Sequence, residues 1–268
     1  KFMVYASKYG KDIKKAAGYG WSTGEVSYDH SAFATAMHAE VDRLSGIHFR
    51  NRKNAGGEIF EDRAEFVDKN TLRLKHSGKT VTAKKILVAV GGRPWRPSPE
   101  ELPGVEHTIT SDEIFHLEEQ PKRLVVMGGG YIAVEFAGVF NALGSKVTLI
   151  NRSETILRSY EQGIVEKLPP IMQGRGMDLQ FGTQIERVTK IDDGALNVSL
   201  TNGETIEADQ VLVATGRAPN VAGLGLENAG VEQGRKGEIV VDEFSKTNVD
   251  SIYAVGDVTD RVQLTPVA

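Results

Sequence analysis

The chain contains no cysteine among its 268 residues, and its hydrophobic residues occur in short runs. The missing cysteine excludes a disulfide framework, a thiolate nucleophile and a cysteine-ligated metal within these residues. No apolar run approaches the ~20 residues that a transmembrane helix needs, and the polar start KFMVYASKYGKDIKK does not resemble a signal peptide. We therefore expect no membrane association and a cytoplasmic location, with a plastid or another organelle left open.

An excess of positive charge is also missing, because 32 Lys and Arg residues stand against 36 Asp and Glu residues. Binding to a nucleic-acid backbone requires a basic surface, so nucleic acid is not an expected partner. The six histidines show no H-E-x-x-H or comparable metal-ligand spacing, and no metal site is predicted. Length and composition fit one large or two modest domains of an α/β protein.

The most informative stretch, residues 123–158, has the pattern of a strand, a glycine turn, a helix and a second strand. The turn GGGYIA at residues 128–133 is a G-x-G-x-x-A motif, and no second one occurs in the chain. Gly128 permits the tight turn, Gly130 lets backbone N–H groups approach a pyrophosphate, and Ala133 allows close packing of helix on strand. The N-terminus of the helix is then expected to receive the phosphates of a dinucleotide.

The end of the second strand indicates which dinucleotide is bound. An NAD enzyme usually places Asp or Glu there to accept from the ribose 2′-hydroxyl, whereas this chain has Asn151 followed by Arg152 and Arg158. Arginines pair with a 2′-phosphate through charge-assisted hydrogen bonds, and Asn151 removes a repelling carboxylate. The pattern predicts NADP. The alternative is that both arginines are ordinary surface charges, which equal affinity for NADH would favour.

Two helices are expected to open the chain, at residues 2–17 and from a cap at Asp29 or Ser31 to about residue 54. The second helix carries an apolar stripe of Phe33, Met37, Val41, Leu44 and Ile47. Four strands are predicted to follow, at residues 58–63, 71–75, 80–83 and 85–90.

The last of these strands runs into Gly-Gly-Arg-Pro, and a later strand in DQVLVATGRAPN, residues 209–220, runs into the similar Gly-Arg-Ala-Pro. This echo indicates two domains of similar architecture, unless two glycine loops coincide by chance. Between the glycine turn and the second echo, a β-meander is expected to replace a crossover helix. Its strands are predicted at residues 184–191, 195–200 and 204–208, with turns at 192–194 and 202–203, and further strands at 210–214, 238–241 and 252–255.

Five motifs occur in an order that matches a known family: VAVGGRP, GGGYIAVEFAG, ATGRAPN, IYAVGDV and LTPVA. With them the chain resembles the FAD-dependent pyridine nucleotide-disulfide oxidoreductases, and among these the branch that reduces glutathione disulfide. The resemblance covers essentially all of the chain. It implies an α/β fold with two nucleotide-binding, Rossmann-like three-layer domains of FAD/NAD(P)-binding type and the inserted β-meander. Residues 1–105 would be the C-terminal part of an FAD-binding domain, 106–217 an NADP-binding domain, and 218–268 a return to the FAD domain and the start of a central domain.

The resemblance also implies parts that these residues do not supply. The family's redox disulfide would lie just before Lys1, and its FAD fingerprint further upstream. A dimerisation domain with a catalytic His-Glu pair would follow Ala268. We therefore expect an internal fragment with no catalytic residue, whose full-length protein is a homodimer through that C-terminal domain.

Roles for individual residues follow from the resemblance. Asp257 would accept from a ribitol hydroxyl of FAD, Thr265 would offer its backbone N–H to the isoalloxazine ring, and Tyr131 would cover the flavin where nicotinamide stacks. Glu135 would pair with a lysine that lies outside the chain, and Arg217 would lie near both cofactors. A turn, a helix cap, helix packing and a surface arginine are the alternatives for Asp257, Thr265, Tyr131 and Arg217. The predicted cofactor-binding residues are Gly128, Gly130, Tyr131, Ile132, Glu135, Asn151, Arg152, Arg158, Gly216, Arg217, Ala64, Gly91, Ser111, Asp257, Leu264 and Thr265.

For the substrate, the resemblance places Ile47, His48 and Asn51 along a helix that lines the disulfide pocket, with a solvated helix face as the alternative. The implied reaction passes a hydride from NADPH to FAD and two electrons on to glutathione disulfide. Alternatives are a trypanothione or mercuric type of disulfide reductase. A further alternative is that this chain by itself is an NADP-binding module without catalytic activity.

Overall fold

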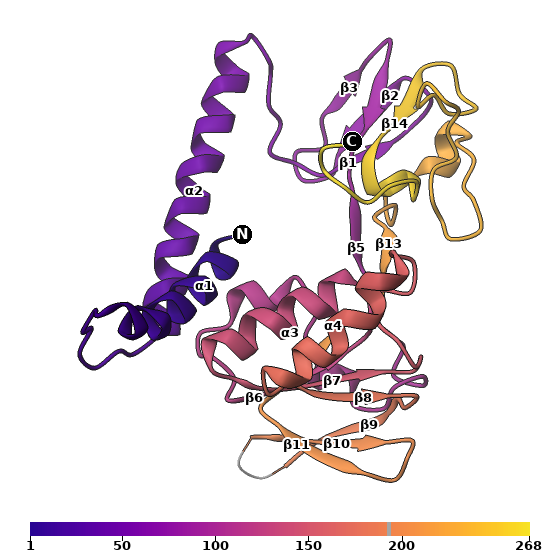
Figure 1. The fold of residues 1–268 in the computed structure, drawn as a ribbon. Helices are drawn as coiled ribbons and strands as arrows, with labels where there is room; N and C mark the ends of the chain where they lie inside the picture. The colour runs from indigo at the N-terminus through magenta and orange to yellow at the C-terminus, as the bar shows by residue number, and fades with distance from the viewer. Residues whose placement is uncertain (192–193) are drawn as a thin grey trace. The chain divides into compact units, whose positions relative to one another are not determined.

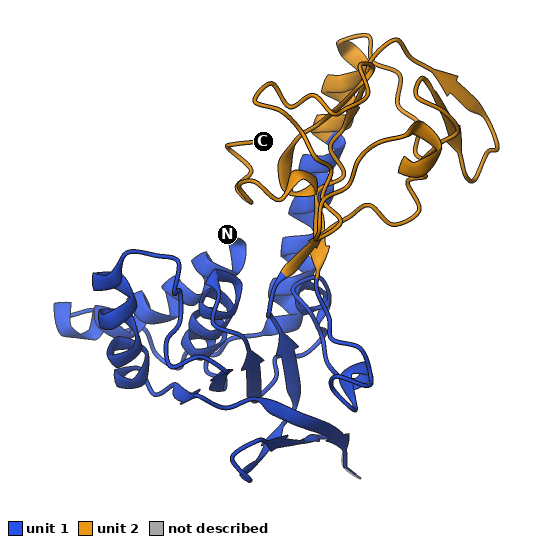
Figure 2. Ribbon diagram, turned by 90° about the vertical axis from the view of Figure 1, so that its right-hand side faces the viewer, with its two compact units in different colours: residues 1–46, 95–216 blue, residues 47–94, 217–268 orange. Residues whose placement is uncertain are grey.

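The computed structural model describes residues 1–191 and 194–268, and Figure 1 traces their elements in chain order. The chain divides into two compact units, coloured separately in Figure 2. Unit 1 comprises residues 1–46 and 95–216, and unit 2 comprises residues 47–94 and 217–268. The cofactor domains predicted from the sequence use other boundaries, and those ranges stay a prediction.

A parallel sheet with the strand order β12-β6-β7-β8 forms the centre of unit 1. Helix α3 connects β6 to β7, and helix α4 connects β7 to β8, as expected for parallel strands that need crossover connections. The strands and helices are β6 (Arg123–Met127), α3 (Tyr131–Leu143), β7 (Lys146–Asn151), α4 (Gln162–Gly174), β8 (Asp178–Phe181) and β12 (Gln210–Val213).

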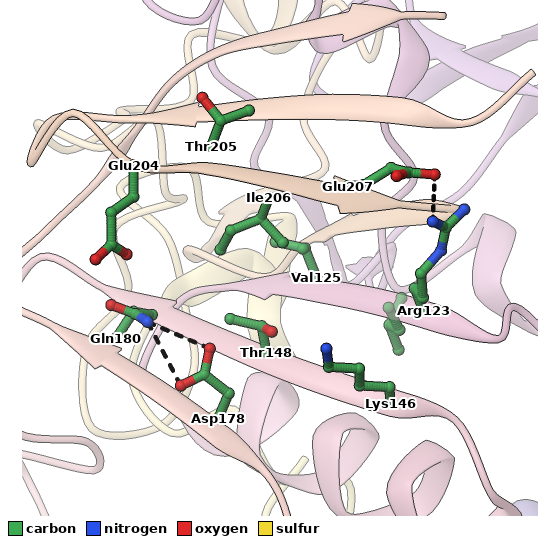
Figure 3. A pocket seen from close by; sticks show the side chains of 11 residues that line it. Arg123, Val125, Lys146, Thr148, Asp178, Gln180, Glu204, Thr205, Ile206 and Glu207 are labelled. Carbon is green, nitrogen blue, oxygen red and sulfur yellow. Dashed lines mark hydrogen bonds and ion pairs between the residues drawn. The ribbon is translucent and has the colours of Figure 1, made fainter.

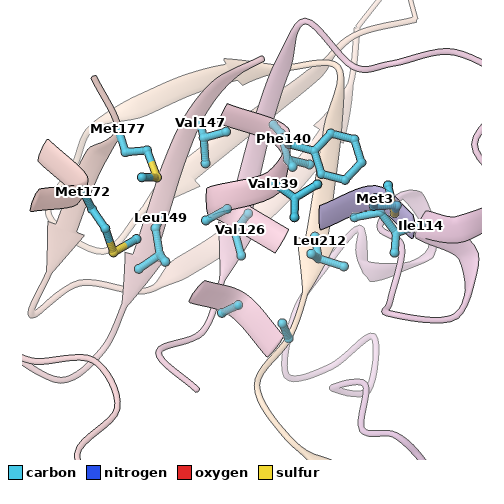
Figure 4. Close-up of a cluster of buried hydrophobic side chains, with 14 of the residues drawn as sticks. Met3, Ile114, Val126, Val139, Phe140, Val147, Leu149, Met172, Met177 and Leu212 are labelled. Atoms are coloured by element: carbon cyan, nitrogen blue, oxygen red, sulfur yellow. The ribbon is translucent and has the colours of Figure 1, made fainter. Parts of the chain in front are cut away.

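Both faces of this sheet are covered, and so its strands are continuous apolar runs rather than alternating ones. In β6, Leu124 and Val126 belong to the core on the helix side, whereas Val125 belongs to the core on the side of the β-meander. Figure 4 shows the helix-side core, in which Phe140 of α3 is fully buried. The glycine turn after β6 is therefore held between a rigid strand and a rigid helix.

The predicted β-meander is confirmed as the antiparallel strands β9 (Ile185–Lys190), β10 (Leu196–Leu200) and β11 (Thr205–Ala208). It links β8 to β12, in the place of a crossover helix. At its second turn, Gly203 has a φ of 86° and donates from its backbone N–H to the carbonyl of Leu200. Of the turn predicted at 192–194, Asp192 and Asp193 lie outside the described residues.

The two opening helices are α1 (Phe2–Ala16), followed by the short η1 (Ala17–Tyr19), and α2 (His30–Asn54). Asp29 is the cap of α2, because its carboxylate accepts from the backbone N–H of Ala32 at 2.9 Å. Helix α1 packs on α3 and contributes Met3 to the helix-side core. In α2, Met37 joins this core, but Val41 and Leu44 of the predicted stripe stay 43% and 36% exposed.

Helix α4 has no counterpart in the sequence prediction, because it contains Pro169 and Pro170, which usually end a helix. Its N-terminus is capped by Glu161, whose carboxylate accepts from the N–H of Ile164 at 3.2 Å. Burial of Met172 in the helix-side core stabilises the last turn. Tertiary packing thus overrides the local signal of the prolines.

Unit 2 is built from short strands around its own core. Its strand pairs are an antiparallel meander β1-β2-β3, the parallel pair β4 and β14, and the antiparallel pair β5 and β13. The strands are β1 (Ala64–Phe66), β2 (Thr71–Leu74), β3 (Thr80–Thr82), β4 (Ile86–Val88), β5 (Gly92–Pro94), β13 (Arg217–Pro219) and β14 (Ile252–Ala254). Short helices complete both units: η2 (Val105–His107), η3 (Glu113–His116), η4 (Leu226–Ala229) and η5 (Gly256–Thr259).

Two predicted strands of unit 2 are wrong. Residues 58–63 form no strand, because the Asp62 carboxylate accepts from the backbone N–H groups of Arg63, His76 and Ser77 and so fixes a loop. Residues 238–241 make one isolated bridge instead of a strand, since Glu238 closes a tight loop by accepting from the N–H of Gly234. Side-chain and turn bonds replace ladder bonds in both segments.

Candidate nucleotide-binding site

The glycine turn between β6 and α3 has the geometry that a dinucleotide requires. Gly128 has a φ of 135°, and a Cβ at this position would lie 2.4 Å from the carbonyl oxygen of Ala214. Its N–H donates to the carbonyl of Ile150 at 2.9 Å, which joins the turn to β7. Only glycine fits here, as the motif predicted.

Gly130 precedes α3 and leaves the helix N-terminus open. No side chain caps this 13-residue helix, and a Cβ at Gly130 would meet no atom within 4 Å. The first N–H groups of a helix have no partner inside it, and they attract anions. The space and the donors fit a pyrophosphate.

The loop after β7 carries two arginines and belongs to the same unit as the glycine turn. Arg152 and Arg158 are exposed, and neither forms an ion pair or a side-chain hydrogen bond with the described residues. Asn151 is half-buried, and its Nδ2 donates to the carbonyls of Ser153 at 3.2 Å and Thr155 at 2.8 Å. Both arginines are therefore available to an anionic ligand.

Sequence reasoning missed two residues that shape this loop. Gly129, the middle glycine, accepts at its carbonyl from the backbone N–H of Leu157 at 2.7 Å. Leu157 has a φ of 51°, a conformation that residues with a Cβ rarely adopt. The run of three glycines was the available signal for Gly129, whereas nothing in the sequence marks Leu157.

The remaining predicted site residues of unit 1 lie on α3, near the end of β12 and in the turn before η3. Tyr131 is 37% exposed at the first position of α3, and Ile132 packs against the helix-side core. Glu135 is exposed and forms no ion pair within the described part of the chain. Gly216 accepts at its carbonyl from the N–H of Trp95 at 3.0 Å, and Ser111 lies in a turn before η3.

In unit 2, residues 92–94 and 217–219 from the two similar segments pair with each other as β5 and β13. Arg217 donates from Nη2 to the carbonyl of Gly92 at 2.7 Å, and its Nε lies 3.5 Å from Oδ2 of Asp257. A Cβ at Gly92 would lie 3.2 Å from that of Asp257. The structure thus brings together two predicted cofactor residues that are 40 positions apart in the sequence (257 minus 217).

The other predicted flavin residues of unit 2 are more dispersed. Ala64 begins β1, and Gly91, with a φ of 70°, accepts from the N–H of Asn220 at 3.0 Å. Leu264 and Thr265 are exposed in a turn in which the carbonyl of Leu264 accepts from the N–H of Val267 at 2.9 Å.

The three predicted substrate residues lie on the C-terminal half of α2. Ile47 and Asn51 are one helical turn apart, as are His48 and Asn51. Ile47 is half-buried, whereas His48 and Asn51 are exposed. Their side chains are thus neighbours on the surface of one helix.

A polar cleft of about 430 Å³ lies elsewhere in unit 1, between the parallel sheet and strand β11 (Figure 3). Arg123 at its rim pairs with Asp209 and Glu207, and hydrogen bonds to these two carboxylates raise the pKa of Arg123. No predicted cofactor or substrate residue belongs to its lining, which is Arg123, Leu124, Val125, Lys146, Thr148, Asp178, Gln180, Glu204, Thr205, Ile206 and Glu207.

Residues 1–191 and 194–268 contain neither a candidate metal centre nor a candidate membrane span. No cluster of three or more His, Asp or Glu side chains is placed to hold a metal ion. Of the helices in these ranges, none combines the length and the apolar character needed to span a membrane.

Comparison with known proteins places this site in a family. A family model described as pyridine nucleotide-disulphide oxidoreductase matches residues 6–268. The chain belongs to this family. The resemblance and the α/β fold of FAD/NAD(P)-binding type predicted from the motifs are confirmed, and membership implies FAD and NADP(H) as cofactors, as predicted.

Individual relatives agree with the family assignment. Glutathione reductase of Burkholderia cepacia is 43% identical over all of this chain, and trypanothione reductase of Trypanosoma congolense is 35% identical. The chain spans 58% and 56% of the lengths of these two relatives. The solved structure of an HOCl-induced flavoprotein disulfide reductase from Escherichia coli matches with a TM-score of 0.83 and 30% identity, over 90% of this chain and 55% of that chain.

Proposed function

We propose that this chain supplies the NADPH site and part of the FAD site of a flavoprotein disulfide reductase that reduces glutathione disulfide. The observation that carries the proposal is the open N-terminus of α3 in the same unit as two exposed, unpaired arginines. The first feature fits a pyrophosphate and the second a 2′-phosphate. Together they select NADPH over NADH.

Each residue has a defined task in this proposal. The N–H groups after Gly130 hold the pyrophosphate, and Arg152 and Arg158 hold the 2′-phosphate. Tyr131 would cover the flavin where the nicotinamide ring stacks. Asp257 accepts from a ribitol hydroxyl, and its two oxygens can serve both that hydroxyl and Arg217. FAD held at this site would supply the redox chemistry that links hydride transfer from NADPH to the two-electron reduction of a disulfide.

Glutathione disulfide is the preferred substrate because the glutathione reductase relative is more similar than the trypanothione reductase relative, at 43% against 35% identity. Ile47, His48 and Asn51 would contact the disulfide substrate from α2. We extend the proposal to the whole protein as a homodimer in the cytoplasm or an organelle. The domain ranges 1–105, 106–217 and 218–268 describe its cofactor domains.

A second candidate is a nucleotide-binding module that lacks disulfide reductase activity. It is favoured by the absence of cysteine from these residues, which excludes a redox disulfide within them. For the chain by itself we prefer this second candidate, because no residue within it has a predicted catalytic role.

Titration of the purified chain with NADPH and NADH, together with its flavin absorbance and disulfide turnover, tests both candidates. We expect NADPH to bind about 100-fold more tightly than NADH, since two charge-assisted bonds each contribute roughly 1.5 kcal/mol. Equal affinities would contradict the NADPH site. Retained flavin with turnover of glutathione disulfide would refute the module without activity.

A further inference from the structure

The loop of residues 151–158 carries both arginines of the proposed NADPH site, and its backbone is fixed from within. We propose that Asn151 is a positioning residue: its side-chain amide holds this loop in the shape that presents Arg152 and Arg158 to a 2′-phosphate, and Gly129 provides the space for that amide. The inference rests on the proposed NADPH site. It assigns Asn151 an active part there, beyond the absence of a carboxylate.

The first step is the pair of hydrogen bonds that Asn151 makes. Its Nδ2 donates to the carbonyls of Ser153 and Thr155, at 3.2 Å and 2.8 Å. These bonds fold the chain back directly after β7 and fix the backbone on both sides of Ser153. An aspartate could not replace this amide, because a carboxylate has no donor and would face two carbonyl oxygens.

The second step is the contact between Asn151 and the glycine turn. A Cβ at Gly129 would lie 2.6 Å from Nδ2 and 2.9 Å from Oδ1 of Asn151. Gly129 is not in the left-handed region, so its backbone would accept alanine. A side chain at this position would therefore displace the amide of Asn151.

The third step is the far end of the loop. Leu157 donates from its backbone N–H to the carbonyl of Gly129 at 2.7 Å, and its φ of 51° shows that the chain is held in an unfavourable conformation. Ile156 and Leu157 are buried, which anchors the residue before Arg158. Gly129 thus contacts both ends of a loop whose exposed side chains are Arg152, Glu154 and Arg158.

A fixed loop matters because binding a phosphate with flexible arginines costs conformational entropy. With the backbone already in place, only the two arginine side chains must be ordered. Glu154, the carboxylate of this loop, lies against Gly182, where a Cβ would be 2.4 Å from its Oε1. In this proposal the loop meets the ligand through its arginines at the 2′-phosphate. The effect of Asn151 is therefore expected to be confined to ligands that carry this phosphate.

Two nucleotides that differ in this phosphate separate positioning from general stability. Binding of 2′,5′-ADP and of 5′-AMP to the whole chain is measured by calorimetry for the wild type and for Asn151→Ala. We expect the variant to lose roughly tenfold in affinity for 2′,5′-ADP, as for one lost hydrogen-bonded contact, and to keep its affinity for 5′-AMP. Ser153→Ala is the matched control, because it keeps the carbonyl that accepts from Asn151, and it is expected to bind both nucleotides like the wild type.

Gly129→Ala completes a double-mutant cycle. Alone it is expected to displace the amide and to weaken the binding of 2′,5′-ADP as Asn151→Ala does. In the Asn151→Ala background it is expected to reduce this affinity no further. If Asn151→Ala does not fold, Asn151→Leu, which has a similar volume and no donor, takes its place in the cycle.

The outcomes distinguish the inference from the proposed function. A wild type that binds 2′,5′-ADP no better than 5′-AMP overturns the NADPH site, and the inference with it. A wild type with the expected preference, combined with Asn151 variants that keep it or that lose both nucleotides equally, overturns the positioning role alone.

Discussion

The guanidinium of Arg217 connects two distant parts of unit 2, since its Nη2 donates to the carbonyl of Gly92 while its Nε lies 3.5 Å from Oδ2 of Asp257. Both side chains are mostly buried, at 19% and 26% exposure. The same two residues are the predicted neighbours of the cofactors. In the proposed FAD site the same group would hold the fold and face the cofactor, so stability and binding would depend on each other.

Replacing Arg217 is expected to destabilise unit 2 by about 1–3 kcal/mol, because Arg217→Ala leaves a carboxylate and a carbonyl without their donor. Urea unfolding of the chain measures this loss. Arg93→Ala in the paired strand β5 removes an exposed guanidinium with no recorded partner among the described residues and serves as control. Equal losses for the two variants would contradict a specific role of Arg217.

Alanine at Gly128 is expected to reduce stability, whereas alanine at Gly130 is expected to reduce NADPH binding. Gly128→Ala forces a Cβ to within 2.4 Å of the carbonyl oxygen of Ala214 and is expected to cost about 3 kcal/mol or more of folding free energy. The added methyl group of Gly130→Ala meets open space, so stability is expected to stay unchanged. The same group fills the pyrophosphate position and is expected to weaken NADPH binding at least about tenfold. Thermal unfolding and NADPH titration of both variants test this contrast. Loss of stability in Gly130→Ala would count against it.

His30 predicts how unit 1 responds to acid. The imidazole is 7% exposed beside Tyr28 and Phe140, and burial lowers the pKa of His30 below the ordinary 6.5. Because the unfolded chain binds this proton more readily than the native one, stability is expected to fall as the pH drops below about 6.5. His30→Gln is expected to remove the part of the stability loss between pH 7.5 and 5 that comes from protonation of His30. Urea midpoints at the two pH values measure it, with the exposed His76→Gln as control, and a variant with an unchanged pH response would refute the assignment.

Asp62 makes the opposite prediction for unit 2. Hydrogen bonds from the backbone N–H groups of His76 and Ser77 lower the pKa of Asp62 to about 2. Its contribution is therefore present above pH 3.8, the ordinary value, and is lost as the pH falls toward 2. Asp62→Ala is expected to free the amides of His76 and Ser77, which hydrogen exchange at neutral pH detects. Protection factors like those of the wild type would show that the loop does not need this carboxylate.

The parts of the molecule that could be predicted from sequence are those fixed by neighbours along the chain. The turn from Gly128 to Ala133 depends on residue size at fixed spacing, and β6 and the meander strands depend on short apolar patterns. Helix α4 could not be predicted, because burial of Met172 outweighs two prolines that signal a helix end. The segment at 58–63 has the sequence pattern of a strand. It forms a loop because the carboxylate of Asp62 accepts from backbone N–H groups 14 and 15 residues away.

The candidate site divides in the same way. Arg152 and Arg158 follow from their distance to the glycines, and this is enough to predict the kind of nucleotide. The contacts of Gly129 with Asn151 and Leu157 depend on the shape of a folded loop, so the sequence gives no sign of them. The pairing of Arg217 with Asp257 requires that β13 and η5 meet, which no local pattern encodes.

The pairing of β5 with β13 and of β4 with β14 affects how the protein folds during synthesis. Strand β4 ends at Val88, but its partner β14 begins at Ile252, so unit 2 cannot close until Ile252 has left the ribosome. At roughly 5–20 residues per second, this delay is on the order of 10 s. Residues 95–216 emerge during that interval and can build the parallel sheet of unit 1 first. During this interval the edges of β4 and β5 are exposed and unpaired. They are then the part of the nascent chain that most needs a chaperone.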